Sequence, residues 1–93
     1  MPHIIDNKIY HDDQKIGWID GIHIRDMSNN KLGWFENGFV YSENGARKVA
    51  YIHENELVYE NGRPSSALEH INEEIQGNIP ILAKCAVKVL LDL

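Results

Sequence analysis

Three lysines and three aromatic residues recur at matching positions, and they are the residue types in this sequence most suited to binding a ligand. They are Lys15, Lys31 and Lys48 together with Trp18, Trp34 and Tyr51, each ring following its lysine by three residues. If the chain closes into a ring, the ammonium groups could surround one axis as an anion site, and the aromatic rings could stack a sugar or a base. The structural alternative is that the lysines are solvated strand starts that discourage edge pairing, and that the rings lie in the core. Spacing this regular favours the structural alternative.

The other reactive side chains show no catalytic or metal-binding spacing. The five histidines form no HxH or HExxH pattern and no pairing with cysteine. His11-Asp12-Asp13 could hold a cation, but polar residues are expected in a hairpin turn in any case. Cys85 lies in an apolar segment, where a free cysteine behaves as a small hydrophobic residue. Because no Ser-His-Asp elbow, phosphate loop or dinucleotide fingerprint is present either, we predict no enzyme activity, no metal and no cofactor.

Composition and charge limit the class of protein. A chain of 93 residues with 43% hydrophobic and 25% charged residues is expected to form one domain, residues 1–93. Its net charge of -5 argues against nucleic-acid binding, because phosphates would meet a negative surface. A single cysteine excludes an internal disulfide, and the first residues contain no long apolar segment for secretion. We therefore expect a cytoplasmic protein.

An internal repeat supplies the elements that position these residues. The segment Lys15-Ile16-Gly17-Trp18-Ile19 returns as Lys31-Leu32-Gly33-Trp34-Phe35 and as Lys48-Val49-Ala50-Tyr51-Ile52. Successive rings are 16 and 17 residues apart, which suits one β-hairpin per unit. Turn-forming pairs such as Asp20-Gly21 and Asn37-Gly38 separate the units. Residues 8–65 are therefore predicted to form four tandem β-hairpins.

Side-chain alternation predicts two faces on each returning strand. Ile16 is expected on the same face as Trp18, with Gly17 on the other face, and the other two copies repeat the pattern with Gly33 and Ala50 at the small position. A small residue at the same point of each copy indicates that a neighbouring backbone or aromatic ring approaches there. We infer that each hairpin packs its ring against its neighbour's small residue, and that four units close into a ring.

The repeat resembles a known family. The motif runs from Tyr41-Ser42-Glu43-Asn44-Gly45 through Lys48-Val49-Ala50-Tyr51-Ile52, followed by Tyr59-Glu60-Asn61-Gly62-Arg63-Pro64. It is similar to the four-fold beta-flower proteins, an uncharacterised bacterial family, over about Ile9 to Ala67. The resemblance implies four hairpins in a pseudo-four-fold ring, and with one or two C-terminal helices expected from the residues that follow, the predicted fold is mainly β (α+β). It implies no catalytic residues. Membrane-occupation and choline-binding repeats, whose units are longer, are more distant alternatives.

The C-terminal third departs from the repeat. Ser66 and Glu69 fit a capping box, so a helix is predicted over residues 66–76. Residues 79–93 are predicted to form a second, apolar helix, with Pro80 in its first turn. On this helix Lys84, Lys88 and Asp92 would form one narrow solvated stripe. Val87 and Val89 also fit a strand over residues 86–91.

The apolar helix has two main interpretations. With about 13 residues it is shorter than the ~20 needed to span a bilayer, so we predict no membrane insertion. It either lies across one mouth of the ring as a core helix or also pairs with another subunit, forming a dimer or larger homo-oligomer. The interface would then contain Ile81, Leu82, Cys85, Val89, Leu90 and Leu93.

Two functions follow from this architecture. The first is a small non-enzymatic interaction or scaffold module that self-associates through its C-terminal helix and can bind a protein partner. The second is a ligand-binding protein whose repeated lysines and aromatic rings line a pocket for a small anion or saccharide.

Overall fold

The computed structural model describes all residues 1–93 and is mainly β. One antiparallel sheet contains nine strands, each hydrogen-bonded to the next along the chain. The strands are β1 (His3–Ile5), β2 (Lys8–His11), β3 (Gln14–Asp20), β4 (His23–Asp26), β5 (Lys31–Glu36), β6 (Phe39–Ser42), β7 (Arg47–His53), β8 (Glu56–Tyr59) and β9 (Ser66–Ala67). The helices are the 3-10 turn η1 (Asn44–Ala46), α1 (Leu68–Glu74) and α2 (Ile81–Leu90). The prediction of a mainly β chain of hairpins with C-terminal helices is confirmed.

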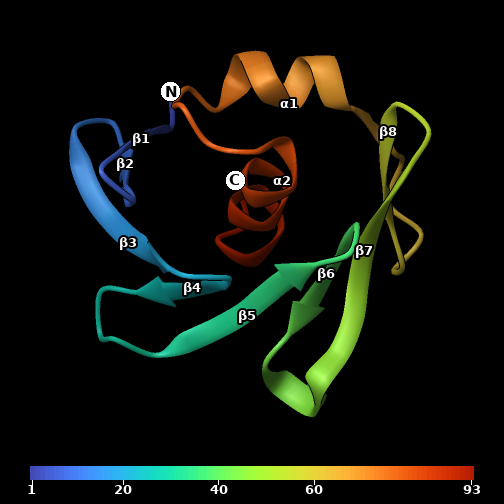
Figure 1. Ribbon diagram of the computed structural model, residues 1–93, viewed down its shortest axis with the longest axis horizontal. Coiled ribbons are helices and arrows are strands. Elements are labelled where there is room, and N and C mark those ends of the chain that lie inside the picture. Colours follow the sequence, from blue (N-terminus) through green and yellow to red (C-terminus); the bar gives the residue numbers. More distant parts are fainter.

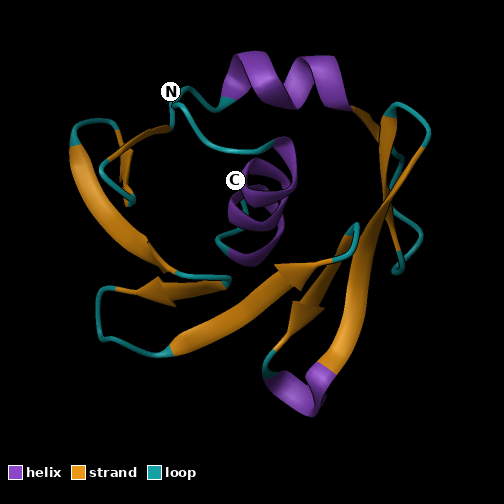
Figure 2. Cartoon of the chain, viewed as in Figure 1, coloured by secondary structure: helices purple, strands orange, loops and turns teal.

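The sheet curves around α2 (Figures 1 and 2). Helix α1 lies across the gap between the two ends of the sheet, with β8 on one side and the N-terminus on the other. After α1 the chain returns to the first strand, where Ile4 N–H donates to the Gln76 carbonyl at 2.7 Å and Gln76 N–H donates to the Pro2 carbonyl at 3.2 Å. Because β1 and β9 do not pair, α1 and residue 76 join the two ends of the sheet.

A β-bulge recurs in three hairpins and changes which side chains point inward. Ile9 pairs with Gly17 but Tyr10 pairs with Lys15, which leaves Ile16 as an extra residue. The same shift occurs between β4 and β5 and between β6 and β7, where the extra residues are Leu32 and Val49. All three extra residues pack against the core. The predicted placement of these residues with the aromatic rings is therefore wrong, because a bulge interrupts the alternation.

The aromatic residues of the repeat lie on the outer face of the sheet. Gly17, Gly33 and Ala50 are buried, so the next residue in each strand, Trp18, Trp34 or Tyr51, points away from α2. None of these three rings belongs to the buried core cluster or packs against it. The prediction that they are core residues is therefore wrong.

Other parts of the chain approach the small residues of the repeat closely, as the sequence indicated. The neighbours are the backbone of the paired strand and, at Gly33, a side chain of α2. A Cβ atom built on Gly17 would overlap the carbonyl oxygen of Arg25. One built on Gly33 would overlap the Tyr41 carbonyl oxygen and lie 2.9 Å from both Leu90 Cδ atoms. No aromatic side chain is among these neighbours, so the expected packing of rings on small residues is wrong.

The fourth repeat extends further than predicted. Leu57 pairs with Ser66, and Leu68 N–H donates to the Asn55 carbonyl at 2.9 Å, as Ile19 N–H does to the Asn7 carbonyl in the first repeat at 2.7 Å. Helix α1 therefore begins at Leu68 and is shorter than the predicted span of 66–76. The predicted capping box is absent, because Ser66 takes part in strand pairing and no side chain caps the helix.

The first strand, β1, was not predicted. It pairs with β2 through the turn at Asp6 and Asn7, whose φ angles are 50° and 64°. Two consecutive positive φ values are typical of a type I′ hairpin turn, and Asp and Asn tolerate them better than most residues do. The Asp6-Asn7 pair could therefore have been used to predict the turn, and with it the strand β1.

Helix α2 is the centre of the core. Residues 83–87 are buried, and Cys85, Ala86 and Val87 are 0% exposed. The remaining residues of the predicted interface, Ile81, Leu82, Val89, Leu90 and Leu93, are partly buried against the core. The helix thus lies inside the curved sheet rather than across its mouth, and the strand interpretation of residues 86–91 is wrong. Neither helix is long and apolar enough to cross a membrane.

Candidate functional site

Outward-facing rings form an outer aromatic belt along the sheet. The belt consists of Tyr10, Trp18, Trp34, Phe39, Tyr41 and Tyr51, all partly buried. Trp34 and Tyr41 are opposite one another on β5 and β6, and their rings stack with centroids 5.0 Å apart and planes 11° from parallel. The Arg25 guanidinium lies 5.7 Å from the Trp18 ring, and Lys48 Nζ lies 4.5 Å from the Phe39 ring. Neighbouring rings and cations therefore cover much of each ring, as expected for stabilising cross-strand pairs.

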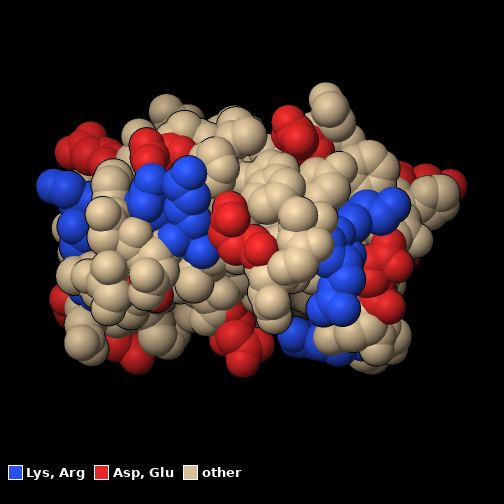
Figure 3. All heavy atoms as spheres, turned by 90° about the horizontal axis from the view of Figure 1, so that it is seen from below, with Lys and Arg blue, Asp and Glu red and all other residues tan.

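Charged side chains are scattered over the outer face of the lower part of the sheet. Figure 3 shows basic and acidic groups there in small separate patches, with uncharged surface between them. This face carries no continuous field of one sign, so it offers little to attract an anion over a distance. Four basic residues gather at one mouth of the curved sheet.

The mouth groove is a broad open hollow of about 1210 Å³ at the C-terminal end of α2. It lies between β5, the β6–β7 turn and the β8–β9 turn, and is lined by residues 31–32, 42–44, 47–49, 59–61, 63, 89–90 and 92. Its basic residues are Lys31, Arg47, Lys48 and Arg63, of which Lys48 lines the edge of the groove while its Nζ lies over the Phe39 ring of the outer aromatic belt. Of the three predicted lysines, the structure brings Lys31 and Lys48 into this groove, and Lys15 is not part of its lining.

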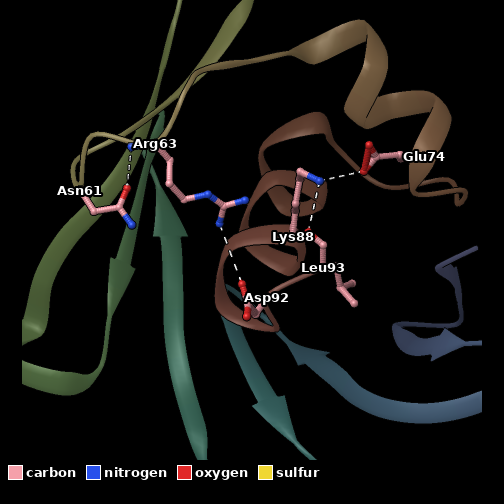
Figure 4. Close-up of polar contacts among 6 residues, drawn as sticks. All are labelled: Asn61, Arg63, Glu74, Lys88, Asp92 and Leu93. Atoms are coloured by element: carbon pink, nitrogen blue, oxygen red, sulfur yellow. Dashed lines mark hydrogen bonds and ion pairs between the residues drawn. The ribbon is translucent and has the colours of Figure 1, made fainter.

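The groove also contains three carboxylates, those of Glu43, Glu60 and Asp92, but only Asp92 pairs with one of its cations. Asp92 Oδ1 lies 3.9 Å from Arg63 Nη1, and no other ion pair within 4.0 Å joins residues of the groove. Figure 4 shows Arg63 reaching from the β8–β9 turn toward Asp92 after the last turn of α2. The turn itself is held by Asn61 Oδ1, which accepts the Arg63 N–H at 3.0 Å.

Tyr59 lies in the groove lining with an unsatisfied polar group. The residue is 6% exposed, and its buried hydroxyl has no hydrogen-bond partner. The Arg63 guanidinium lies 4.6 Å from the centroid of its ring. A buried hydroxyl without a partner is destabilising, so a hydrogen-bond acceptor that reached this hydroxyl would stabilise the protein.

The floor of the groove is apolar because the bulges turn side chains inward there. Leu32 and Val49, the extra residues of two bulges, line the groove together with Val89 and Leu90 from the last turn of α2. All four are partly exposed although they pack against the core. The core therefore opens toward solvent at this mouth.

The predicted solvated stripe of α2 faces α1 instead. Lys84 is 4% exposed, and its Nζ donates to Asn72 Oδ1 at 2.8 Å and to the Asn72 carbonyl at 3.4 Å. Lys88 Nζ donates to Glu74 Oε1 at 2.8 Å and to the Leu93 carbonyl at 3.2 Å (Figure 4). The two lysines thus join α2 to α1 and to the chain end, which is why the predicted stripe is wrong for them.

The structure gives little support for nucleophilic or metal chemistry. Burial raises the pKa of the Cys85 thiol from 9.0 to about 11, against the opposing charge of Lys88, so the reactive thiolate is rare at neutral pH. No group of three His, Cys, Asp or Glu side chains is placed to hold a metal ion. The outstanding feature is the mouth groove, with a basic rim and an apolar floor.

Sequence reasoning missed three groove residues. Arg47 and Arg63 lie in or beside turns and Tyr59 precedes one, outside the repeated Lys-x-Gly-aromatic segment. The sequence did hint at the two arginines, because Arg47 is next to Lys48 and Arg63 follows the Asn61-Gly62 turn.

Comparison of the chain with protein-family models, with curated proteins and with solved structures finds no significant match.

Proposed function

We propose that the protein is a small non-enzymatic binding module that takes up an anionic ligand in the mouth groove. The observation that carries this proposal is the convergence of Lys31, Arg47, Lys48 and Arg63, four of the nine basic residues, from three segments of the chain. Three of the four have no carboxylate within ion-pair distance. With three carboxylates in the same lining the groove has a small positive excess, in a chain whose net charge is -5.

The expected affinity for a simple anion is modest. A hydrogen bond to a charged group contributes about 1.5–3 kcal/mol, so two such bonds contribute roughly 3–6 kcal/mol before the cost of association. A dissociation constant of 1 mM corresponds to about 4.1 kcal/mol. A small carboxylate held by two rim cations should therefore bind with a dissociation constant on the order of millimolar.

An NMR titration tests the proposal. Citrate added to the 15N-labelled full chain should shift backbone amides of residues 42–49, 59–63 and 89–92. The matched variants are Lys48→Gln and Lys15→Gln, which change equivalent repeat positions inside and outside the groove. We expect Lys48→Gln to weaken citrate binding several-fold and Lys15→Gln to leave it unchanged. Shifts spread over the outer aromatic belt, or equal effects of both variants, would contradict the proposal.

We further propose that the hairpins are copies of one unit arranged in a pseudo-four-fold ring, as in the four-fold beta-flower proteins, and that the protein is cytoplasmic. Equivalent hydrogen bonds in the four repeats support the first proposal. The donors Ile19, Phe35, Ile52 and Leu68 reach the carbonyls of Asn7, Ile22, Gly38 and Asn55 at 2.7, 3.0, 2.9 and 2.9 Å. The recurring bulges support it as well.

Self-association is the second candidate function. The buried position of Cys85 at the centre of α2 argues against pairing through that helix. The partly exposed outer aromatic belt favours a contact between sheet faces instead. Light scattering of the full chain over a range of concentrations tests this. A dimer that dissociates when Trp34 is replaced by Arg would support it, and a monomer at all concentrations would refute it.

A further inference from the structure

We infer that the ligand of the mouth groove is amphipathic: a carboxylate or phosphate-ester headgroup at the basic rim, joined to a short unbranched apolar chain over the floor. This inference rests on the proposed anion binding and adds the apolar part of the ligand. A simple anion would use the rim and leave the floor in water.

The floor is the first argument. Leu32, Val49 and Leu90 belong to the packed periphery of the core, yet each keeps exposed surface in the groove. Apolar surface gathered in a concave site is typical of a binding site rather than of ordinary protein surface. A flexible apolar chain can follow such a floor without requiring a flat stacking partner.

The order of residues along the chain is the second argument. Lys31 directly precedes Leu32, and Lys48 directly precedes Val49, so each floor residue from the sheet has a cation next to it. Lysine and arginine carry long apolar stems that end in a charge. The stem of Lys31 can lie along an apolar chain while its charged end meets the headgroup, and Lys48 can do the same once its Nζ leaves the Phe39 ring.

Tyr59 and Arg63 provide the third argument. The Arg63 guanidinium lies 4.6 Å from the centroid of the Tyr59 ring in the same lining, and the Tyr59 hydroxyl is buried without a partner. A headgroup oxygen could accept a hydrogen bond from this buried hydroxyl, which has no other acceptor, once Arg63 moves off the ring to meet the headgroup. The arrangement suits an anionic oxygen better than an apolar group.

Asp92 occupies the side of Arg63 that a ligand headgroup would use. Its side chain is 93% exposed and 3.9 Å from the guanidinium, so the pair is loose. A bound headgroup would replace this carboxylate as the partner of Arg63. Nucleotides fit less well, because the stacking rings of the protein lie on the outer aromatic belt and Arg63 already covers Tyr59.

Calorimetric titration of the full chain with five probes tests the inference. The probes are acetate, inorganic phosphate, octanoate, octyl phosphate and octanol, each below its micelle concentration. Each buried methylene should strengthen binding about fourfold, so even partial burial of the chain should make octanoate at least tenfold tighter than acetate. Octanol should bind far more weakly than octanoate. The two octyl probes decide whether the headgroup is a carboxylate or a phosphate ester.

Three variants locate the binding without altering the core. Arg63→Gln should weaken octanoate binding roughly five- to tenfold, and Asp92→Asn should strengthen it about two- to threefold by removing the competing carboxylate. Lys15→Gln is the matched control and should change nothing. A series of hexanoate, octanoate and decanoate tests the floor without mutation, because affinity should rise with chain length until the floor is filled.

The outcomes separate this inference from the proposed function. If octanoate binds no tighter than acetate while both still bind, the apolar part is wrong and anion binding stands. If octanol binds as tightly as octanoate, or if no probe binds, both are wrong.

Discussion

Replacing Gly33 by alanine should destabilise the protein strongly, because two neighbours occupy the space of the new methyl group. The built Cβ would overlap the Tyr41 carbonyl oxygen and lie 2.9 Å from both Leu90 Cδ atoms. Leu90 can rotate, but the carbonyl belongs to the paired strand β6 and can move only with its backbone. The substitution therefore has to push β5 and β6 apart or displace the end of α2.

The magnitude follows from this geometry. Overpacking a core usually costs about 1–3 kcal/mol, and a rigid backbone obstacle places Gly33→Ala near the upper end of that range. In a domain of this size each 1 kcal/mol lowers the melting temperature by about 4–8 °C. The expected fall is therefore roughly 10–25 °C.

Thermal and urea unfolding followed by circular dichroism measure the effect. Gly21→Ala is the control, since Gly21 has φ +64° but open space around its Cβ position. Its cost should be limited to the left-handed backbone, about 1 kcal/mol. The steric account fails if Gly33→Ala is no more destabilising than Gly21→Ala.

Three further predictions concern individual groups. The Cys85 thiol, with its pKa raised to about 11, should react with Ellman's reagent at pH 8 only as fast as the protein unfolds; rapid reaction of the native protein would contradict its burial. Asn72→Ala should cost about 1–3 kcal/mol in urea unfolding, because Lys84 loses its side-chain acceptor; a neutral effect would show that water replaces the amide. Backbone N–H groups, chiefly that of Asn30, hold the pKa of Asp26 below its usual 3.8. The carboxylate therefore stabilises the fold above pH 3.8, and this contribution is lost as pH falls through the lowered pKa. Asp26→Asn should destabilise at pH 7 and approach wild type in acid, and a difference independent of pH would refute this.

The hairpins could be predicted from sequence because their turn chemistry is local. Asp20-Gly21 and Asn37-Gly38 mark tight turns without reference to the rest of the fold. The inward and outward faces could not be predicted, because one extra residue at Ile16, Leu32 or Val49 reverses the alternation along the rest of the strand. This single effect moved the aromatic rings from the predicted core to the outer face.

The C-terminal region shows a different limit. Lys84 and Lys88 fit a solvated stripe by spacing alone, but the partners that bury them, Asn72 and Glu74, belong to another helix. The mouth groove was missed for the same reason, because residues such as Arg63 and Leu90 come from distant segments of the sequence and meet only in the folded chain. Two of the three predicted lysines, Lys31 and Lys48, line the groove, but the groove itself could be found only from the fold.

The most direct test of an amphipathic anion site is a set of intermolecular NOEs between octanoate and the methyl-labelled protein. Our account predicts NOEs from the octanoate chain to the methyl groups of Leu32, Val49 and Leu90 at the mouth groove. NOEs to the rings of the outer aromatic belt, or none to these three residues at saturating octanoate, would contradict it.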